Sequence, residues 1–119
     1  MSPRGIDQVE TISLAYLAFA RHNPGQYRVL FERSPANIAS PPHLYAEGID
    51  AFGLLVHALE DAVADGSTRD IDPTLDGQSL FAALHGVAAL PPALPGFPWV
   101  DETVLVRNVI AKVVGRRPR

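Results

Sequence analysis

The sequence predicts an all-α fold, with about five helices in an antiparallel bundle, formed by a single domain that covers residues 1–119. Two observations predict this class. Apolar residues recur at steps of three and four along most of the chain, and prolines and glycines separate the segments that carry this pattern. The expected helices are residues 7–22, 24–32, 41–65, 73–90 and 101–115.

The composition limits the classes of function. Hydrophobic residues make up 47% of the chain and charged residues 19%, which favours a packed core over disorder and indicates that a partner or ligand covers some apolar surface. The net charge of −3 argues against a dedicated nucleic-acid binder, and the absence of cysteine excludes disulfides and thiol chemistry. Without a signal-peptide pattern or an apolar run of about 18 residues, we expect a soluble, cytoplasmic protein with no membrane partner.

The first expected helix, residues 7–22, carries one apolar stripe that passes through Val9, Ile12, Tyr16 and Phe19. Asn23 then suits a cap before Pro24, which is tolerated in the first turn of the next short helix.

The third expected helix, residues 41–65, is the longest. It starts after Ser40 and closes at Gly66. Gly48 and Gly53 mark either close packing or room for a ligand. Its apolar stripe is formed by Tyr45, Ile49, Phe52, Val56, Leu59 and Val63, with a flanking stripe of Leu44, Ala51, Leu55, Ala58 and Ala62.

The fourth expected helix, residues 73–90, opens with the cap Asp72 and has no charged side chain from Gln78 to Leu90. A helix that is apolar on all sides is buried on all sides, and a second copy of the chain is the simplest cover for one of them. The sequence therefore predicts a homodimer. Residues 91–98, rich in proline, are expected to form a loop.

The last segment allows two interpretations. The β-branched residues of TVLVRNVIAKVV favour a strand, whereas the spacing of its polar residues favours a helix. Asp101 as a cap and Gly115 as a stop also fit a helix, which we expect. The basic tail that follows, including Arg116 and Arg117, is interpreted as a solubilising end with cations at a helix C-terminus.

Two motifs carry a resemblance to a known family. AYLAFARHNPGQYRVLF (residues 15–31) and FAALHGVAAL (residues 81–90) resemble the C-terminal effector-binding and dimerisation domain of TetR-family transcriptional regulators, in the subgroup with a Trp-His-Gly signature. Phe81 stands where tryptophan is usual. The matching positions are Tyr16, Phe19, Ala20, Asn23, Pro24, Tyr27 and Phe31 in the first motif, and His85 and Gly86 in the second.

The resemblance implies a helical bundle whose last two helices pair with those of a second subunit. The expected interface residues are Leu80, Leu84, Val87, Val106, Val109 and Val113. Full-length members begin with a helix-turn-helix domain, which the residues before Asp7 are too few to supply. DNA binding is therefore expected only through a domain absent from this chain.

The resemblance also implies an effector pocket among the preceding helices. The residues that converge there if those helices pack on the fourth are Tyr16, Phe19, Tyr27, Phe31, Phe52, Val56, Phe81 and His85. Each of them taken singly also fits a filled core. His85 is interpreted as a buried neutral imidazole, next to a close helix approach at Gly86, or as a ligand contact.

No sequence pattern of a catalytic, metal or cofactor site occurs. His57 lies one turn from Glu60 and Asp61 but lacks further ligands on that face, and no HExxH, GxGxxG or GxSxG pattern is found. We therefore expect no enzyme, no metal and no cofactor. The predicted function is that of a ligand-sensing and dimerisation domain of a TetR-like regulator, which binds a small, largely apolar effector. The alternative is a stand-alone dimerisation module that pairs with and titrates a full-length regulator.

Overall fold

The computed structural model describes residues 4–25 and 42–117, except the side chains of residues 42–49. This part of the chain is all-helical, which confirms the predicted class. Its helices are α1 (Gly5–His22), α3 (Pro42–Ala64), α4 (Pro73–Ala93) and α5 (Glu102–Val113). The short helix predicted at residues 24–32 lies mostly outside the described residues. Among the described helices, none has the length and apolar content needed to cross a membrane.

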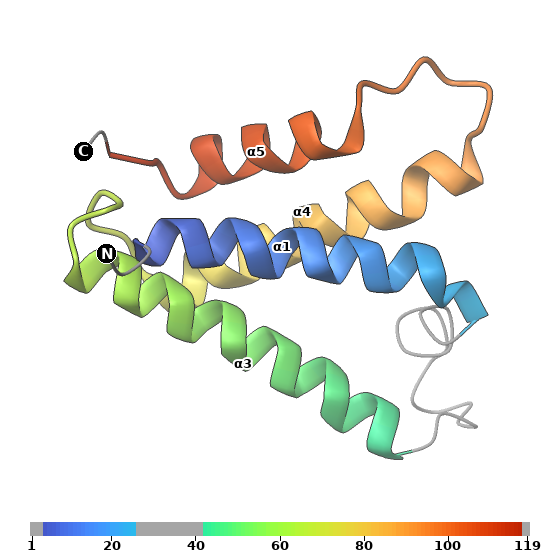
Figure 1. Cartoon of the computed structure of the whole chain (residues 1–119). Coiled ribbons are helices and arrows are strands. Elements are labelled where there is room, and N and C mark those ends of the chain that lie inside the picture. The colour runs from blue at the N-terminus through green and yellow to red at the C-terminus, as the bar shows by residue number, and fades with distance from the viewer. Residues whose placement is uncertain (1–3, 26–41, 118–119) are drawn as a thin grey trace.

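Helix α1 is the centre of the bundle. It contacts α3, α4 and α5, and Figure 1 shows it between α3 and α5, with α4 behind it and both chain ends at the same end of the molecule. It runs antiparallel to α3 and α5, because Gly5 lies against Ala62 and Arg21 pairs with Glu102. Three faces of α1 are therefore covered by neighbouring helices.

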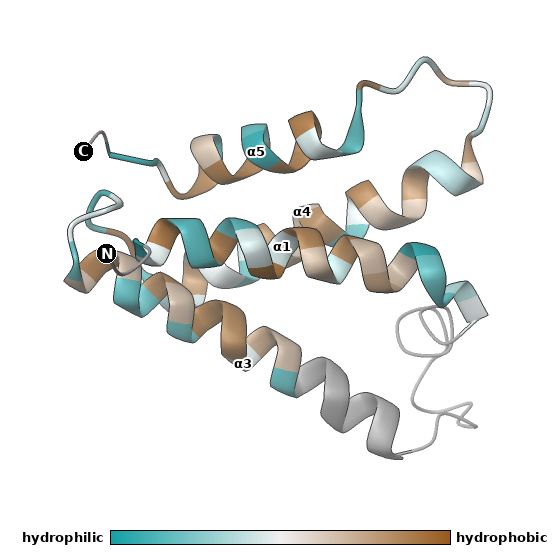
Figure 2. Ribbon diagram, in the orientation of Figure 1, coloured by the Kyte–Doolittle hydropathy of each residue, from teal (hydrophilic) through white to brown (hydrophobic). Residues whose placement is uncertain are grey.

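The core is built from aliphatic and small side chains of all four helices. Figure 2 shows apolar residues on the side of α5 that faces α1 and α4. Among the described residues, no aromatic ring is fully buried in this core. The core residues are Ile6, Val9, Leu17, Ala20, Leu55, Ala58, Leu59, Ala62, Leu80, Leu84, Ala88, Val106, Ile110 and Val114.

The buried face of α1 differs from the predicted stripe. Of the predicted residues only Val9 is fully buried, whereas Ile12, Tyr16 and Phe19 are half-buried. The fully buried face instead includes Ser13, whose hydroxyl donates to the carbonyl of Val9 at 2.7 Å. The predicted stripe therefore lies at the margin of the buried face, where Ile12 and Tyr16 pack against the core.

The predicted caps are confirmed. The carboxylate of Asp72 accepts from the backbone N–H groups of Thr74 and Leu75, at 3.0 and 3.1 Å, at the start of α4. Asp101 caps α5 in the same way, so the C-terminal segment is a helix despite its β-branched residues. Gly66 and Gly115 have φ values of +74° and +81°, the left-handed conformation that ends a helix.

Helix α4 is longer than predicted. It continues to Ala93, through Pro91 and Pro92, where a loop was expected to start. The helix persists because a side chain of α1 supplies the hydrogen bonds that the two prolines cannot make, as described below.

Two glycines set the spacing of the helices. A Cβ on Gly5 would lie 2.4 Å from the backbone nitrogen of Ala62, and a Cβ on Gly77 would lie 3.2 Å from Cγ2 of Val56. The sequence left open whether Gly53 marks close packing or free space, and it has no neighbouring atom within 4 Å. Close packing was expected beside Gly86, which meets only Leu90 of its own helix, at 4.0 Å. The helix approach predicted beside Gly86 is therefore wrong for the described part of the chain.

A polar junction caps the first turn of α1; it consists of residues 4–6, 65–69 and 113–117. Arg4 provides no side-chain cap at this helix start. Instead, the N–H of Gly5 donates to Oδ2 of Asp65 at 2.6 Å, and the N–H of Ile6 donates to Oγ of Ser67 at 3.0 Å. The turn between α3 and α4 thus satisfies the free donors of α1.

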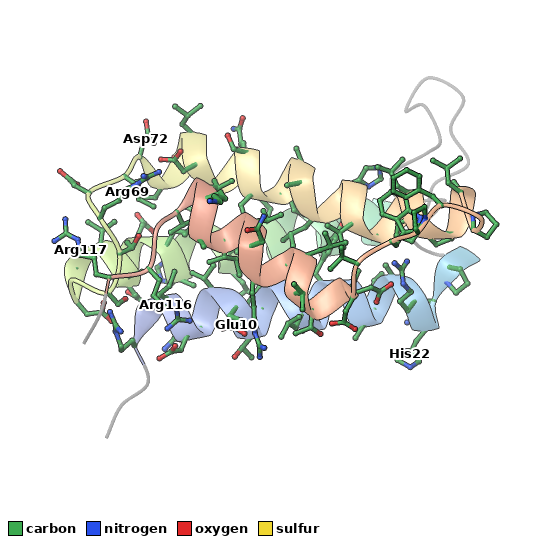
Figure 3. All side chains as sticks on the ribbon, turned by 90° about the horizontal axis from the view of Figure 1, so that it is seen from above. Glu10, His22, Arg69, Asp72, Arg116 and Arg117 are labelled. Atoms are coloured by element: carbon green, nitrogen blue, oxygen red, sulfur yellow. The ribbon has the colours of Figure 1, made fainter. Side chains whose placement is uncertain are left out.

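The same junction holds the end of α5. The Thr68 hydroxyl lies 2.8 Å from the carbonyl of Val114 and 2.7 Å from that of Gly115, and the N–H of Arg117 donates to the carbonyl of Ser67 at 2.9 Å. The guanidinium of Arg4 donates to the carbonyl of Arg117. Figure 3 shows Arg69, Arg116 and Arg117 gathered at this end of the molecule. The two ends of the chain are therefore tied to one turn.

Ion pairs join the outer sides of α1 and α5. Nη1 of Arg116 lies 2.6 Å from Oδ1 of Asp7, and Nη2 of Arg116 lies 3.1 Å from Oε2 of Glu10 (Figure 3). Nε of Arg107 lies 2.5 Å from Oε1 of the same Glu10. Beyond the solubilising and helix-end role expected from the sequence, Arg116 thus pairs with two carboxylates of α1. Because all four groups are partly exposed, each pair contributes only about 0–1 kcal/mol.

Hydrogen bonds within the polar junction lower the pKa of Asp65 below its ordinary value of 3.8. The largest cause is the hydrogen bond with Ser67, followed by the N–H of Gly5. A carboxylate with a depressed pKa in the folded state stabilises the fold at pH values above the pKa of the unfolded chain. This contribution disappears as the pH falls through the lowered pKa.

We expect Asp65→Asn to lower the melting temperature at pH 7, because the amide keeps an acceptor but loses the charge. The difference from the wild type should persist down to about pH 5 and shrink below about pH 4, where the unfolded and then the folded carboxyl group are protonated. Melting followed by circular dichroism at pH 7, 5 and 3 measures this. Asp61→Asn, which changes an exposed carboxylate one turn earlier, on α3, is the matched control. A difference that stays the same at every pH would contradict the role assigned to Asp65.

Substituting two glycines by alanine should have opposite effects. Gly5→Ala should destabilise the protein by about 1–3 kcal/mol or more, because the new Cβ meets backbone atoms of α3 that cannot move separately. Gly53→Ala, with open space around it, should stabilise it by up to about 1 kcal/mol through helix propensity. Urea denaturation of both variants tests this, and destabilisation by both would contradict it.

Candidate functional site

An aromatic cluster, defined as Tyr16, Phe52 and Phe81, lies where α1, α3 and α4 meet. The ring centroid of Phe81 is 5.5 Å from that of Tyr16 and 5.3 Å from that of Phe52. The Tyr16 pair is edge-to-face and the Phe52 pair is tilted, geometries that the charge distribution of aromatic rings favours. The three rings come from three helices, so the bundle must pack before the cluster exists.

Gly77 brings α3 and α4 together beside the aromatic cluster. It is buried one turn before Phe81, and a Cβ there would lie 3.2 Å from Val56 and 3.4 Å from Cδ1 of Leu59. A larger side chain would push the helices apart and move Phe52 away from Phe81. The role of Gly77 was missed in the sequence, where nothing distinguishes this glycine from Gly86.

The aromatic cluster is only half-buried. Each of its rings keeps part of its surface exposed, in contrast to the aliphatic core beside it. His85 is also half-buried and follows Phe81 by one helical turn, so the imidazole and the ring occupy the same side of α4. Apolar rings with a phenol and an imidazole nearby have the composition of small-molecule sites.

The remaining predicted ligand residues are distributed as follows. Val56 is half-buried and lies against Gly77, and Phe19 is half-buried one turn beyond Tyr16 on α1. Tyr27 and Phe31 lie outside the described residues. The structure therefore brings together Tyr16, Phe52 and Phe81 directly.

The predicted interface residues are only partly at the surface of the chain. Leu80, Leu84 and Val106 are buried inside the chain's own core and have no surface left for a partner in this conformation. The physical reason is that α4 and α5 pack on each other and on α1, and these residues point into that contact. The other three, Val87, Val109 and Val113, are half-buried at its edge.

A different side of α4 is exposed and uncharged. We call it the uncharged face. Its residues are exposed or half-buried and lie at steps of three and four. Figure 3 shows α4 at one edge of the bundle, with α5 and α1 on the other side. The sequence analysis assigned one side of this helix to a second copy of the chain, and in the single chain one side of α4 is exposed. The uncharged face consists of Leu75, Gln78, Ser79, Ala82, Gly86 and Leu90.

The loop after α4 continues this apolar surface. Leu94, Phe97 and Val100 are exposed, and the ring of Phe97 packs on that of Trp99 with centroids 4.6 Å apart. The indole N–H of Trp99 donates to the carbonyl of Leu94 at 2.9 Å, which fixes the loop. No charged residue occurs in the sequence between Asp76 and Asp101.

Arg21 forms a polar site that was not found in the sequence. Its guanidinium donates to the carbonyls of Val87, at 3.0 Å, and of Ala88, and its Nε donates to Oε1 of Glu102 at 2.6 Å. The α-helical donors of these two carbonyls would be the N–H groups of residues 91 and 92, which are prolines and have none. Arg21 therefore satisfies the two acceptors that the prolines leave free.

The histidines and carboxylates do not gather around a metal. Nδ1 of His57 lies 3.3 Å from Oε1 of Glu60, and both side chains are exposed. Within the described ranges, no group of three or more potential ligands is arranged to hold a metal ion.

Comparisons with known proteins give one match. Residues 9–106 match the model of the family described as Tetracyclin repressor-like, C-terminal domain. No significant match was found among curated proteins or among solved structures. The matched range includes the aromatic cluster, the uncharged face and Arg21, so all three features lie within the part of the chain that resembles the family.

Proposed function

The chain belongs to the family of Tetracyclin repressor-like C-terminal domains, and from this we propose that it is the ligand-sensing and dimerisation domain of a transcriptional regulator. It binds a small, largely apolar effector without transforming it. The observation that carries this proposal is the half-buried aromatic cluster where α1, α3 and α4 meet. DNA binding belongs to a helix-turn-helix domain outside residues 1–119.

The chemistry of the aromatic cluster supports binding rather than catalysis. Apolar ring surface gains free energy when it is removed from water, and the Tyr16 hydroxyl and the His85 imidazole offer polar groups that orient a ligand. Catalysis requires a paired acid and base or an activated nucleophile. The sequence carries no GxSxG, HExxH or GxGxxG pattern of a catalytic or cofactor site. In the proposed role the effector acts by binding alone.

The mechanism is a shift of population between two arrangements of the bundle. A ligand changes the balance of two conformations only by the difference in its affinity for them. An effector seated against Tyr16 and Phe81 contacts both α1 and α4, so its affinity depends on the distance between these helices. Because its affinity differs between the two arrangements, the effector shifts the population toward the arrangement that it binds more tightly.

The uncharged face of α4 is the proposed dimer interface. Leu75 and Leu90 stand at the two ends of the face, and small residues lie between them at Ser79, Ala82 and Gly86. Leu75 precedes Ala82 by about two turns and Leu90 follows it by about two turns. A twofold axis near Ala82 would therefore place the leucines of each copy opposite the other end of the partner's face, which makes the face self-complementary.

The alternative is a dimerisation module that pairs with and titrates a full-length regulator. The uncharged face supports it, because such a module needs an interface but no effector. The two functions differ in whether the aromatic cluster takes up a ligand, and the first experiment below separates them.

We expect the purified protein to bind N-phenyl-1-naphthylamine, a neutral apolar fluorescent probe, in a saturable way. At about 100 times its Kd the probe should stabilise the protein by about 2.7 kcal/mol. Phe81→Ala should weaken binding about tenfold through lost ring contacts, equivalent to about 1.4 kcal/mol. The control is Leu54→Ala, which removes an exposed leucine on α3. Probe fluorescence and thermal shift measure both effects. Equal changes in both variants, or no saturable binding, would reject the sensor and favour the module.

Ala82→Glu should convert the dimer into a monomer with helical content unchanged, because two carboxylates would meet at the twofold axis in an apolar interface. Ala15→Glu, the same change at an exposed position of α1, should leave the dimer intact. Sedimentation velocity over a range of concentrations measures the association. A dimer that persists in Ala82→Glu, or a wild type that is monomeric throughout, would reject this interface.

A further inference from the structure

We propose that Arg21 is a latch that couples the aromatic cluster to the C-terminal turn of α4 and the start of α5. The part of the proposal that involves a ligand rests on the proposed function. The latch itself rests on the contacts of Arg21.

The latch exists because of the sequence of α4. Pro91 and Pro92 lie inside the helix and lack N–H groups, so the carbonyls of Val87 and Ala88 have no donor in their own helix. A carbonyl that stays without a donor costs roughly 1–3 kcal/mol when it is shielded from water. The planar guanidinium donates from three nitrogens, to both carbonyls and to Glu102 at once, which the single nitrogen of a lysine does not match in reach or geometry. The final turn of α4 is therefore held in helical form by a residue of another helix.

The same side chain also holds α5. Its Nε donates to Glu102, which is the first residue of α5 and follows the cap Asp101. Side-chain exposures of 25% for Arg21 and 40% for Glu102 leave this pair partly shielded. One guanidinium thus joins α1, α4 and α5 at the end of the bundle opposite the polar junction.

The latch lies close to the aromatic cluster along both helices. Arg21 follows Tyr16 by five residues on α1, about 7.5 Å along the axis, and Val87 follows Phe81 by six residues on α4, about 9 Å. Helices α1 and α4 run in the same direction here, since Tyr16 meets Phe81 and Arg21 meets Val87. A molecule that inserts between the rings of Tyr16 and Phe81 separates α1 from α4, and this movement pulls the guanidinium away from its two carbonyls.

Release of the latch has a defined effect. The carbonyls of Val87 and Ala88 lose their donors, so the turn from residue 89 to residue 93 opens, and the start of α5 loses its tie to α1. The exposed loop residues Leu94 and Phe97 follow this turn directly. Ligand entry at one site is thereby converted into a change of the apolar surface at the end of α4.

A double-mutant cycle tests the latch without any ligand. Arg21→Ala should raise the unfolding equilibrium constant about tenfold or more in the wild-type background. In the background that carries both Pro91→Ala and Pro92→Ala, the new N–H groups supply the donors. There, Arg21→Ala should raise the unfolding equilibrium constant only about two- to threefold. Arg21→Lys should resemble Arg21→Ala in the wild-type background. The control is Arg107→Ala, which removes an arginine of α5 that pairs with Glu10 of α1. It should raise the unfolding equilibrium constant by the same factor in both backgrounds. Equal losses for Arg21→Ala in the two backgrounds would overturn the latch.

Hydrogen exchange tests the coupling. N-phenyl-1-naphthylamine should raise the exchange rate of amides in residues 89–105 by about tenfold in the wild type, and Arg21→Ala should show this raised rate before the probe is added. Exchange in α3 should not rise. If the probe binds and residues 89–105 keep their exchange rate, the coupling is wrong and the proposed function stands. If the probe does not bind, the proposed function and the coupling both fail, and the mutant cycle alone decides whether Arg21 is a latch.

Discussion

The fold depends on a central helix that cannot cap itself. Three other helices pack on α1, and its first turn lies so close to α3 that only glycine fits at position 5. Gly5 and Ile6 in that turn are buried, and Arg4 offers their N–H groups no side-chain acceptor. Asp65 and Ser67 provide the acceptors from the turn that follows α3. The close contact between α1 and α3 and the cap of α1 are thus made by the same stretch of chain. A change that separates α1 from α3 would therefore also remove the cap of α1.

The close approach of the helices also determines where the rings lie. Small and aliphatic residues fill the space between α1, α3 and α4, and the helices come closest at Gly5 and Gly77. Tyr16, Phe52 and Phe81 are therefore pushed to the margin of the core, where they touch one another and keep exposed surface. A wider bundle would bury the same rings fully and leave no apolar surface for a ligand. The tight packing of α1 against α3 and the availability of the aromatic cluster have the same cause.

The sequence predicted the helices well and the packing partly. Local chemistry marks helix ends, so the caps Asp72 and Asp101 and the left-handed Gly66 and Gly115 were found from residue type and position alone. Periodicity gives a face only to within about one residue, since neighbouring stripes on a helix differ by 100° or less, and for α1 it selected the rings in place of the smaller residues. Contacts between distant residues leave no such mark. Nothing near Arg21 indicates that it meets two carbonyls beside Pro91, and this is why α4 was predicted to end at Leu90.

The polar junction joins residues that are far apart in sequence, and this affects how the chain folds. Gly5 meets Asp65, sixty residues further along, and Arg4 meets Arg117 near the other end of the chain. Helical proteins generally fold fast because their contacts are local, and contacts of such long range slow them. During synthesis α1 emerges first but has no cap until the turn after α3 has been made. It has no cover on its outer side until α5 has left the ribosome. Among the helices of this bundle, α1 is therefore synthesised first, but its packing contacts are completed last.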